Sequence, residues 1–250
     1  MNVSLKIFIG FTVLFLLYHA AAYMIMIENN IPGFFVFQFL FFLSAWLISK
    51  WQTGRGLSAW GLAFSPKLGK FLIGGASMGI LLYGFSWWVN ILSGTEFIQQ
   101  VPAISNILIQ TLPFAFGVIF SSLSEDILTR GYVYFHLHKK FSNLVIIGLS
   151  SVIYVFNHIY KLGNGPESWL YLFFLGILFI IPLVITQRLW FTAAMHWAGN
   201  TFFFITHQVI DTQSTSNGYS ANYLFCLCIL MFLPLTYLVI KKSKLASYKH

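Results

Sequence analysis

Hydrophobic residues occur in eight runs of helix length, separated by short polar connections. The runs cover residues 5–27, 34–49, 70–92, 105–127, 143–161, 168–186, 189–209 and 222–240. About 20 apolar residues in a helix are needed to span the hydrocarbon core of a bilayer. A membrane β-barrel would instead show segments of about ten residues that alternate in polarity. The pattern therefore predicts an all-α, polytopic membrane protein with about eight transmembrane helices in one bundle.

The composition agrees with this pattern. Hydrophobic residues make up 58% of the chain and charged residues 8%, and the mean hydropathy is +0.78. A soluble domain carries about 25% charged residues. The first run resembles a signal peptide, with Lys6 as a basic start and Ala20–Ala22 as a cleavage-like site, but it continues to Ile27 and is long enough to span. We therefore expect a single integral membrane domain over residues 1–250, without a soluble part.

The distribution of charge predicts the orientation. Thirteen of the fourteen Lys and Arg residues fall on one set of connections, and Glu28, Glu96, Glu167 and Asp211 fall on the other. The positive-inside rule then places both termini in the cytoplasm. Despite the net charge of +8, these dispersed bases indicate contacts with membrane lipids and no nucleic-acid partner. We predict a multi-pass protein of the cell membrane, and the compact chain favours a bacterial plasma membrane.

One sequence feature predicts close helix packing. Gly75 and Gly79 are four residues apart in the third apolar run. Small residues at this spacing let two membrane helices approach closely. We interpret the pair as a packing feature and not as part of a reactive site.

Two adjacent carboxylates interrupt the apolar pattern. Glu125 and Asp126 are two of only six acids in the chain, and Arg130 follows four residues after Asp126. Ionisable groups within membrane segments are costly and usually functional. Asp126 and Arg130 share a helix face and can pair, whereas Glu125 is displaced by about 100° around the helix. We therefore predict a structural Asp126–Arg130 pair and a chemical role for Glu125, which suits a general base acting on water.

Two later runs carry polar groups that complement this acid. His158 lies in the segment Tyr154–Ile159, and His196 and Asn200 are four residues apart on one predicted helix face. An imidazole and a carboxamide presented together can donate hydrogen bonds to a developing oxyanion. The same side chains, Glu125, His158 and His196, would also suit a divalent metal such as zinc. The alternative is that each group is only an interhelical hydrogen-bond partner or lies at the lipid headgroups.

The three motifs together resemble those of the CPBP family, the CAAX-protease and bacteriocin-processing (Abi) intramembrane proteases. In this chain they read Glu125-Asp126-x3-Arg130, Tyr154-x3-His158 and His196-x3-Asn200. Residues 105–205 carry the resemblance and would form the catalytic core. The family includes the type II CAAX prenyl endopeptidases. Motifs of other proteases, such as His-Glu-x-x-His and Gly-x-Ser-x-Gly, are absent from the sequence.

The resemblance implies an eight-helix bundle and an intramembrane endopeptidase acting on a membrane-proximal or lipidated peptide. By this analogy Glu125 and His158 activate water, and His196 and Asn200 stabilise the oxyanion. Family members have been described both as metalloproteases and as metal-free glutamate proteases, so a metal stays open. Bacterial members act in peptide maturation, bacteriocin immunity or surface signalling. The alternatives are a non-catalytic membrane scaffold or immunity factor of the same fold, and a small proton-coupled transporter.

Two features of the sequence depart from a simple match. The second acid is Asp126 where the family has Glu, and the aromatic residue is Tyr154 where it has Phe. The run boundaries also place Glu125 near the cytoplasmic end of its helix and His158 near the outer end of the next. We therefore expect residues 105–138 to form one long tilted helix, or a helix broken near Pro113, if the motifs are to meet.

Overall fold

The computed structural model describes residues 2–215, 220–243 and 245, so Met1, His250 and the predicted tail base Lys244 lie outside it. Helices dominate the described residues, which confirms the all-α, polytopic fold. They are α1 (Val3–Met26), α2 (Ile31–Thr53), α3 (Leu68–Leu92), α4 (Ile104–Asp126), α5 (Tyr132–Leu137), α6 (Asn143–Asn157), α7 (Pro166–Thr186), α8 (Trp190–Phe204) and α9 (Ala221–Lys242). Short segments join them: η1 (Leu57–Trp60), η2 (Ile127–Gly131), η3 (Ile159–Asn164), η4 (Ile205–Val209), β1 (Glu96–Gln100) and β2 (Asp211–Ser214).

Each predicted run coincides with a helix, but the helices differ in length. In the described part of the chain, six are long and apolar enough to cross a membrane: α1, α2, α3, α7, α9 and the continuous helix Ile104–Leu137. The helices α6 and α8 have 15 residues each, although η4 extends α8 by one turn. The two short helices carry the histidine motifs.

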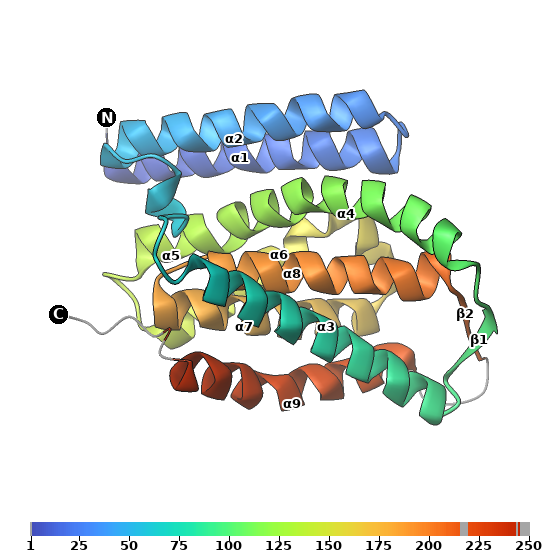
Figure 1. Cartoon of the computed structure of the whole chain (residues 1–250). Coiled ribbons are helices and arrows are strands. Elements are labelled where there is room, and N and C mark those ends of the chain that lie inside the picture. Colours follow the sequence, from blue (N-terminus) through green and yellow to red (C-terminus); the bar gives the residue numbers. More distant parts are fainter. Residues whose placement is uncertain (1, 216–219, 244, 246–250) are drawn as a thin grey trace.

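The helices lie in layers, with α1 and α2 paired along one side (Figure 1). Next to this pair runs α4, followed by α8 and α3, with α6 and α7 behind them and α9 on the opposite side. At one end lie α5, the end of α7 and the start of α8, which we call the basic end because Arg55, Lys139, Lys140 and Arg188 gather there. The other, acidic end carries β1 and β2 with Glu96 and Asp211.

Local signals explain several helix ends. The side chain of Asn30 accepts a hydrogen bond from the Gly33 amide at 2.8 Å and caps α2, which has Pro32 in its first turn. At the other end, Gly54 has a φ of 73° and terminates the helix in the left-handed conformation that glycine adopts readily. These ends fix the length of the first helical hairpin.

The predicted close approach of the third helix is confirmed. A methyl group at Gly75 would clash with the backbone carbonyl of Phe191, and one at Gly79 would clash with that of Met195. Both carbonyls belong to α8, so the two glycines let α3 pack directly against the backbone that carries His196. This contact fixes one side of the site described below.

The long helix resolves the predicted conflict between Glu125 and His158. The chain from Ile104 to Leu137 is one helix of 34 residues, and it passes through Pro113 without breaking. Glu125 lies 12 residues before its end, about 18 Å along the axis. The helix α6 ends at Asn157 rather than at the predicted residue 161, about 22 Å from its start. Both side chains therefore reach a similar depth from the basic end.

A small sheet was not predicted. Strands β1 and β2 pair antiparallel at the acidic end, with Glu96 opposite Ser214 and Phe97 opposite Gln213. The strands are only five and four residues long, too short to give a clear alternating pattern. Beside them, His207 Nε2 lies 3.3 Å from a carboxylate oxygen of Glu96. The sheet joins the connection before α4 to the one after α8.

Candidate active site

The structure brings Glu125, His158 and His196 together, although they come from three separate helices. One carboxylate oxygen of Glu125 lies 3.6 Å from His158 Nδ1, and the other lies 3.6 Å from His196 Nε2. The Glu125 residue is only 4% exposed and His196 only 2%. A buried carboxylate thus lies between two imidazoles.

Asp126 has different surroundings from its neighbour. Its carboxylate forms the predicted ion pair with Arg130, one helical turn later, and both residues are fully buried. The same oxygen of Asp126 also lies 3.2 Å from His196 Nδ1. The pairing prediction is therefore confirmed, but Asp126 has a second contact that the spacing did not indicate: it faces the ring nitrogen of His196 that points away from Glu125.

Aromatic rings surround the buried guanidinium. Its central carbon lies 4.5 Å from the ring centroid of Tyr154 and 5.0 Å from that of Phe179. Arg130 also donates to the Thr129 hydroxyl at 3.0 Å. Aromatic faces attract a cation, and an ion partner offsets part of the cost of burying it. Tyr154, predicted to support the site, is therefore one wall of the Arg130 pocket.

Tyr154 also fixes the orientation of His158. The Nδ1 of His158 donates to the backbone carbonyl of Tyr154 at 2.8 Å, and the two rings meet edge to face with centroids 4.6 Å apart. This contact directs the Nδ1 edge of the imidazole toward Glu125. The aromatic-x3-His motif is thus a geometric unit at the end of α6.

Asn200 lies one turn beyond His196 and faces the same neighbouring helix. Its amide nitrogen donates to the Ser122 hydroxyl at 3.3 Å, while His196 faces Glu125 one turn along on α4. The predicted shared face of His196 and Asn200 is therefore the face that packs against α4.

Two residues near Glu125 were missed by the sequence analysis. The amide nitrogen of Asn157 donates to Glu125 at 2.8 Å. The hydroxyl of Tyr18 lies within hydrogen-bonding reach of the same carboxylate. Asn157 directly precedes His158, and this position was a usable signal. Tyr18 lies in α1, in a different apolar run, and no motif or spacing connects it with Glu125.

A π-helical turn follows the two acids. The segment η2 (Ile127–Gly131) widens the helix directly after Asp126, and all five of its residues are buried. Inside it, the Thr129 hydroxyl donates to the Glu125 carbonyl at 2.7 Å, and Ser150 donates to the Thr129 carbonyl at 2.8 Å. Such turns occur frequently at functional sites because they change the directions of the side chains around them. Here η2 places Arg130 beneath the site.

The arrangement does not fit the predicted metal ligand set. Among the described residues, no group of three His, Cys, Asp or Glu side chains is placed to hold a metal ion. The nitrogen of His158 that faces Glu125 donates to the Tyr154 carbonyl, so it carries a proton and has no lone pair for a metal. A divalent ion such as zinc stays a prediction, and no step below passes through a metal.

The fold and the site define a multi-pass α-helical membrane protein with a glutamate and two histidines at its centre. Residues 107–202 match the family described as type II CAAX prenyl endopeptidase Rce1-like. This match confirms the predicted resemblance to the CAAX-protease family over that segment, which runs from α4 to α8 and contains all three motifs. It indicates a protease of the CAAX type. No curated protein and no solved structure shows significant similarity to the chain.

Proposed function

We propose that this protein is an intramembrane endopeptidase that hydrolyses a peptide bond in a membrane-proximal or lipidated peptide. The observation that carries the proposal is the buried Glu125 carboxylate, with an imidazole nitrogen 3.6 Å from each of its oxygens. The match to the type II CAAX prenyl endopeptidases supports the same reaction class. A distance of 3.6 Å is too long for a direct hydrogen bond but allows one water molecule to contact both groups.

In the proposed first step, Glu125 acts as general base. A water molecule held between Glu125 and His158 loses a proton to the carboxylate, and its oxygen attacks the carbonyl carbon of the substrate. His158 Nδ1 donates to the Tyr154 carbonyl, and this bond holds the ring beside the water. Asn157 donates at 2.8 Å to the same oxygen of Glu125 that faces His158, and this bond fixes the carboxylate beside the water. A positioned base of this kind contributes about 10²–10⁴-fold to the rate.

In the second step, the negative charge moves to the former carbonyl oxygen. His196 Nε2 and the Asn200 amide are the donors we assign to this oxyanion. Asp126 lies 3.2 Å from Nδ1 of His196 and holds the ring with Nε2 directed toward Glu125. The intermediate then collapses: the C–N bond breaks, and the amine leaves with the proton held by Glu125. One water molecule is consumed, and a carboxylic acid and an amine are formed.

The substrate is a proposal drawn from the surroundings of the site. Because the reacting groups lie inside a bundle of apolar helices, a peptide carried by a membrane segment or a lipid anchor reaches them more readily than a soluble peptide. Membrane lipids and such a peptide are therefore the partners that we propose. In a bacterial plasma membrane with both termini in the cytoplasm, the roles to consider are peptide maturation, bacteriocin immunity and surface signalling.

The deciding experiment compares membrane and secreted peptides from cells that carry the wild type, a deletion, Glu125→Gln, or Glu28→Gln at matched expression. Glu28 is an exposed acid that receives a hydrogen bond from Tyr23, far from the site, and serves as the matched control. We expect the Glu125→Gln cells to accumulate the same uncleaved species as the deletion, and the Glu28→Gln cells to match the wild type. If Glu125→Gln cells match the wild type while the deletion differs, the chain is a non-catalytic membrane scaffold.

A further inference from the structure

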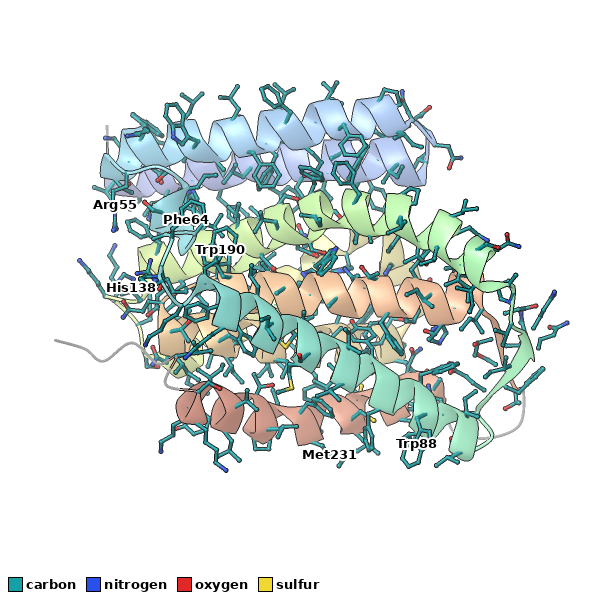
Figure 2. The ribbon with its side chains drawn as sticks, in the orientation of Figure 1. Arg55, Phe64, Trp88, His138, Trp190 and Met231 are labelled. Atoms are coloured by element: carbon teal, nitrogen blue, oxygen red, sulfur yellow. The ribbon has the colours of Figure 1, made fainter. Side chains whose placement is uncertain are left out.

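A cavity of about 650 Å³ opens at the basic end, away from Glu125. Trp60, Gly61, Gly131 and Leu183 are among its lining residues, and much of the rest of the lining is basic. The basic lining residues are Arg55, His136, His138, Lys139, Lys140 and Arg188. Figure 2 shows Arg55 and His138 at the same end of the molecule. We call this space the basic cavity.

Three chain segments bring these bases to one place, and local contacts hold several of them. Arg188 lies in the turn between α7 and α8, where its amide bonds to the Thr186 hydroxyl at 3.1 Å and its guanidinium donates to the Ala63 carbonyl at 3.3 Å. His138 donates through Nδ1 to the Tyr134 carbonyl at 2.9 Å, which leaves Nε2 for another partner. The guanidinium of Arg55 lies 5.7 Å from the ring centroid of Phe135.

The positive charge of the basic cavity has no acidic counterpart in the described chain. No Asp or Glu is among its lining residues, and its two arginines and two lysines form no ion pair with any described residue. Glu125 and Asp126 are committed to the site, and the other four acids belong to connections at the acidic end. A concave wall of one charge sign raises the local concentration of counter-ions. Within the described chain these bases are therefore available to an anionic ligand.

We propose that the basic cavity is a binding site for a phosphate-bearing anion, with its two arginines and two lysines around the phosphate. Arginine binds phosphate through two parallel donors, and lysine contributes a point charge. The cavity lies where α5 and α7 end and α8 begins, and the ends of membrane-spanning helices are where such helices meet phospholipid headgroups. The headgroup of an anionic phospholipid is one source of this chemistry, and a soluble phosphate compound is the other. The site is independent of the proposed peptidase reaction.

The ordinary explanation for such bases is orientation in the membrane, which requires positive charge at this end but no defined site. The two explanations differ in which bases matter. Lys139 and Lys140 line the cavity, whereas Lys50 and Lys70 lie at the same end, carry the same charge and do not line it. All four are exposed, so their replacement by glutamine leaves the packed bundle intact.

The test uses native mass spectrometry of the full chain in neutral detergent. Dihexanoyl phosphatidylglycerol is titrated into the wild type, into Lys139→Gln/Lys140→Gln and into Lys50→Gln/Lys70→Gln, with dihexanoyl phosphatidylcholine as the zwitterionic comparison. Each basic residue near an anionic headgroup contributes about a factor of five in affinity. We expect the first double variant to bind phosphatidylglycerol at least about tenfold more weakly and the second to bind it within about twofold of the wild type.

Inorganic phosphate added as a competitor identifies the source of the anion. Displacement of phosphatidylglycerol by millimolar phosphate supports a soluble phosphate compound, and retention supports a lipid headgroup. The proposal is overturned if the wild type binds phosphatidylglycerol no more tightly than phosphatidylcholine. Equal weakening in the two double variants also overturns it, because diffuse charge would then explain the affinity.

Discussion

Glu125 and Asp126 are adjacent in the sequence but have different partners in the structure. Asp126 pairs with the buried Arg130 and faces His196, whereas Glu125 faces the two imidazoles and the Asn157 amide. A rotation of about 100° between successive helical residues is the origin of this difference. Removing the negative charge of Asp126 should therefore affect the stability of the fold. Removing the negative charge of Glu125 should affect peptide cleavage.

Asp126→Asn should destabilise the fold more than any single change to Glu125. The substitution leaves the guanidinium of Arg130 buried without its ion partner, and breaking a buried pair in this way costs about 3–5 kcal/mol. Unfolding of the purified variants in detergent, followed by circular dichroism, measures the difference. Glu125→Gln is the matched control and should lose less stability than Asp126→Asn, because glutamine keeps an oxygen that accepts from Asn157. Equal losses of stability would contradict the separate roles of the two acids.

Tyr18→Phe should slow peptide cleavage without unfolding the protein. The substitution removes only the hydroxyl that lies within reach of the Glu125 carboxylate. A lost hydrogen bond to a charged group is worth about 1.5–3 kcal/mol, so the cleavage rate should fall by about 10-fold or more. The rate constant for cleavage of the identified substrate is the measurement.

Tyr23→Phe provides the control on the same helix. Its hydroxyl donates to Glu28 at 2.7 Å at the exposed end of α1, and its loss should leave cleavage unchanged. If both tyrosine variants slow cleavage equally, Tyr18 acts through the packing of α1 and not through Glu125.

The sequence predicted the proposed reacting residues better than it predicted the residues that contact them and hold them in place. Glu125, His158 and His196 are recognisable because a polar side chain in an apolar run is rare and each lies in a spaced motif. Asn157 was missed because an amide at a helix end is common. Tyr18 was missed because its contact with Glu125 joins two apolar runs far apart in the sequence, and periodicity within one run carries no information about such a contact.

At the scale of the helix, the hydrophobic runs predicted the order of the helices. They did not predict the residues at which the helices end. Each of the eight runs coincides with a helix of the described chain when Ile104–Leu137 is counted as one, and Gly75 and Gly79 predicted a close approach of α3 but not its partner α8. The early end of α6 at Asn157 and the π-helical turn η2 depend on side chains from other elements, including Ser150, which bonds to the backbone of η2. The sheet of β1 and β2 depends on pairing between distant segments.

Gly79→Ala should weaken the bundle and lower the cleavage rate together. The added methyl group would meet the carbonyl of Met195, next to His196, and would push α8 away from α3. Overpacking of this kind costs about 1–3 kcal/mol. Thermal unfolding in detergent and the cleavage rate of the same sample are the two measurements.

Gly117→Ala is the control for this change. Gly117 lies inside α4, and apart from its chain neighbours and its own helix backbone no described atom lies within 4 Å of the position a methyl group would take. In a helix interior this substitution is neutral or stabilising by up to about 1 kcal/mol. If Gly79→Ala and Gly117→Ala destabilise the bundle equally, the close contact between α3 and α8 does not account for the effect of Gly79→Ala.

At the scale of the whole molecule, the distribution of charge predicts how the candidate active site is oriented in the membrane. The basic cavity and the ends of α5 and α7 lie at one end, and the sheet with Glu96 and Asp211 lies at the other. The reacting groups lie between these ends, because α6 stops at Asn157, directly before His158, and does not cross the full bundle. The orientation that we propose, with the basic end in the cytoplasm, follows from the positive-inside rule.

Cysteine labelling tests this orientation directly. In a background with the buried Cys226 and Cys228 replaced by alanine, one cysteine is placed at Gly69, on the first turn of α3, or at Gln99, on β1. Both positions are exposed, and the two lie at opposite ends of the molecule. A membrane-impermeant maleimide should label Gln99→Cys in intact cells and Gly69→Cys only after permeabilisation. The reverse result would place the basic cavity on the outer side of the membrane. An anionic headgroup of the inner leaflet could not reach it there. Its ligand would then be a soluble phosphate compound or a lipid of the outer leaflet.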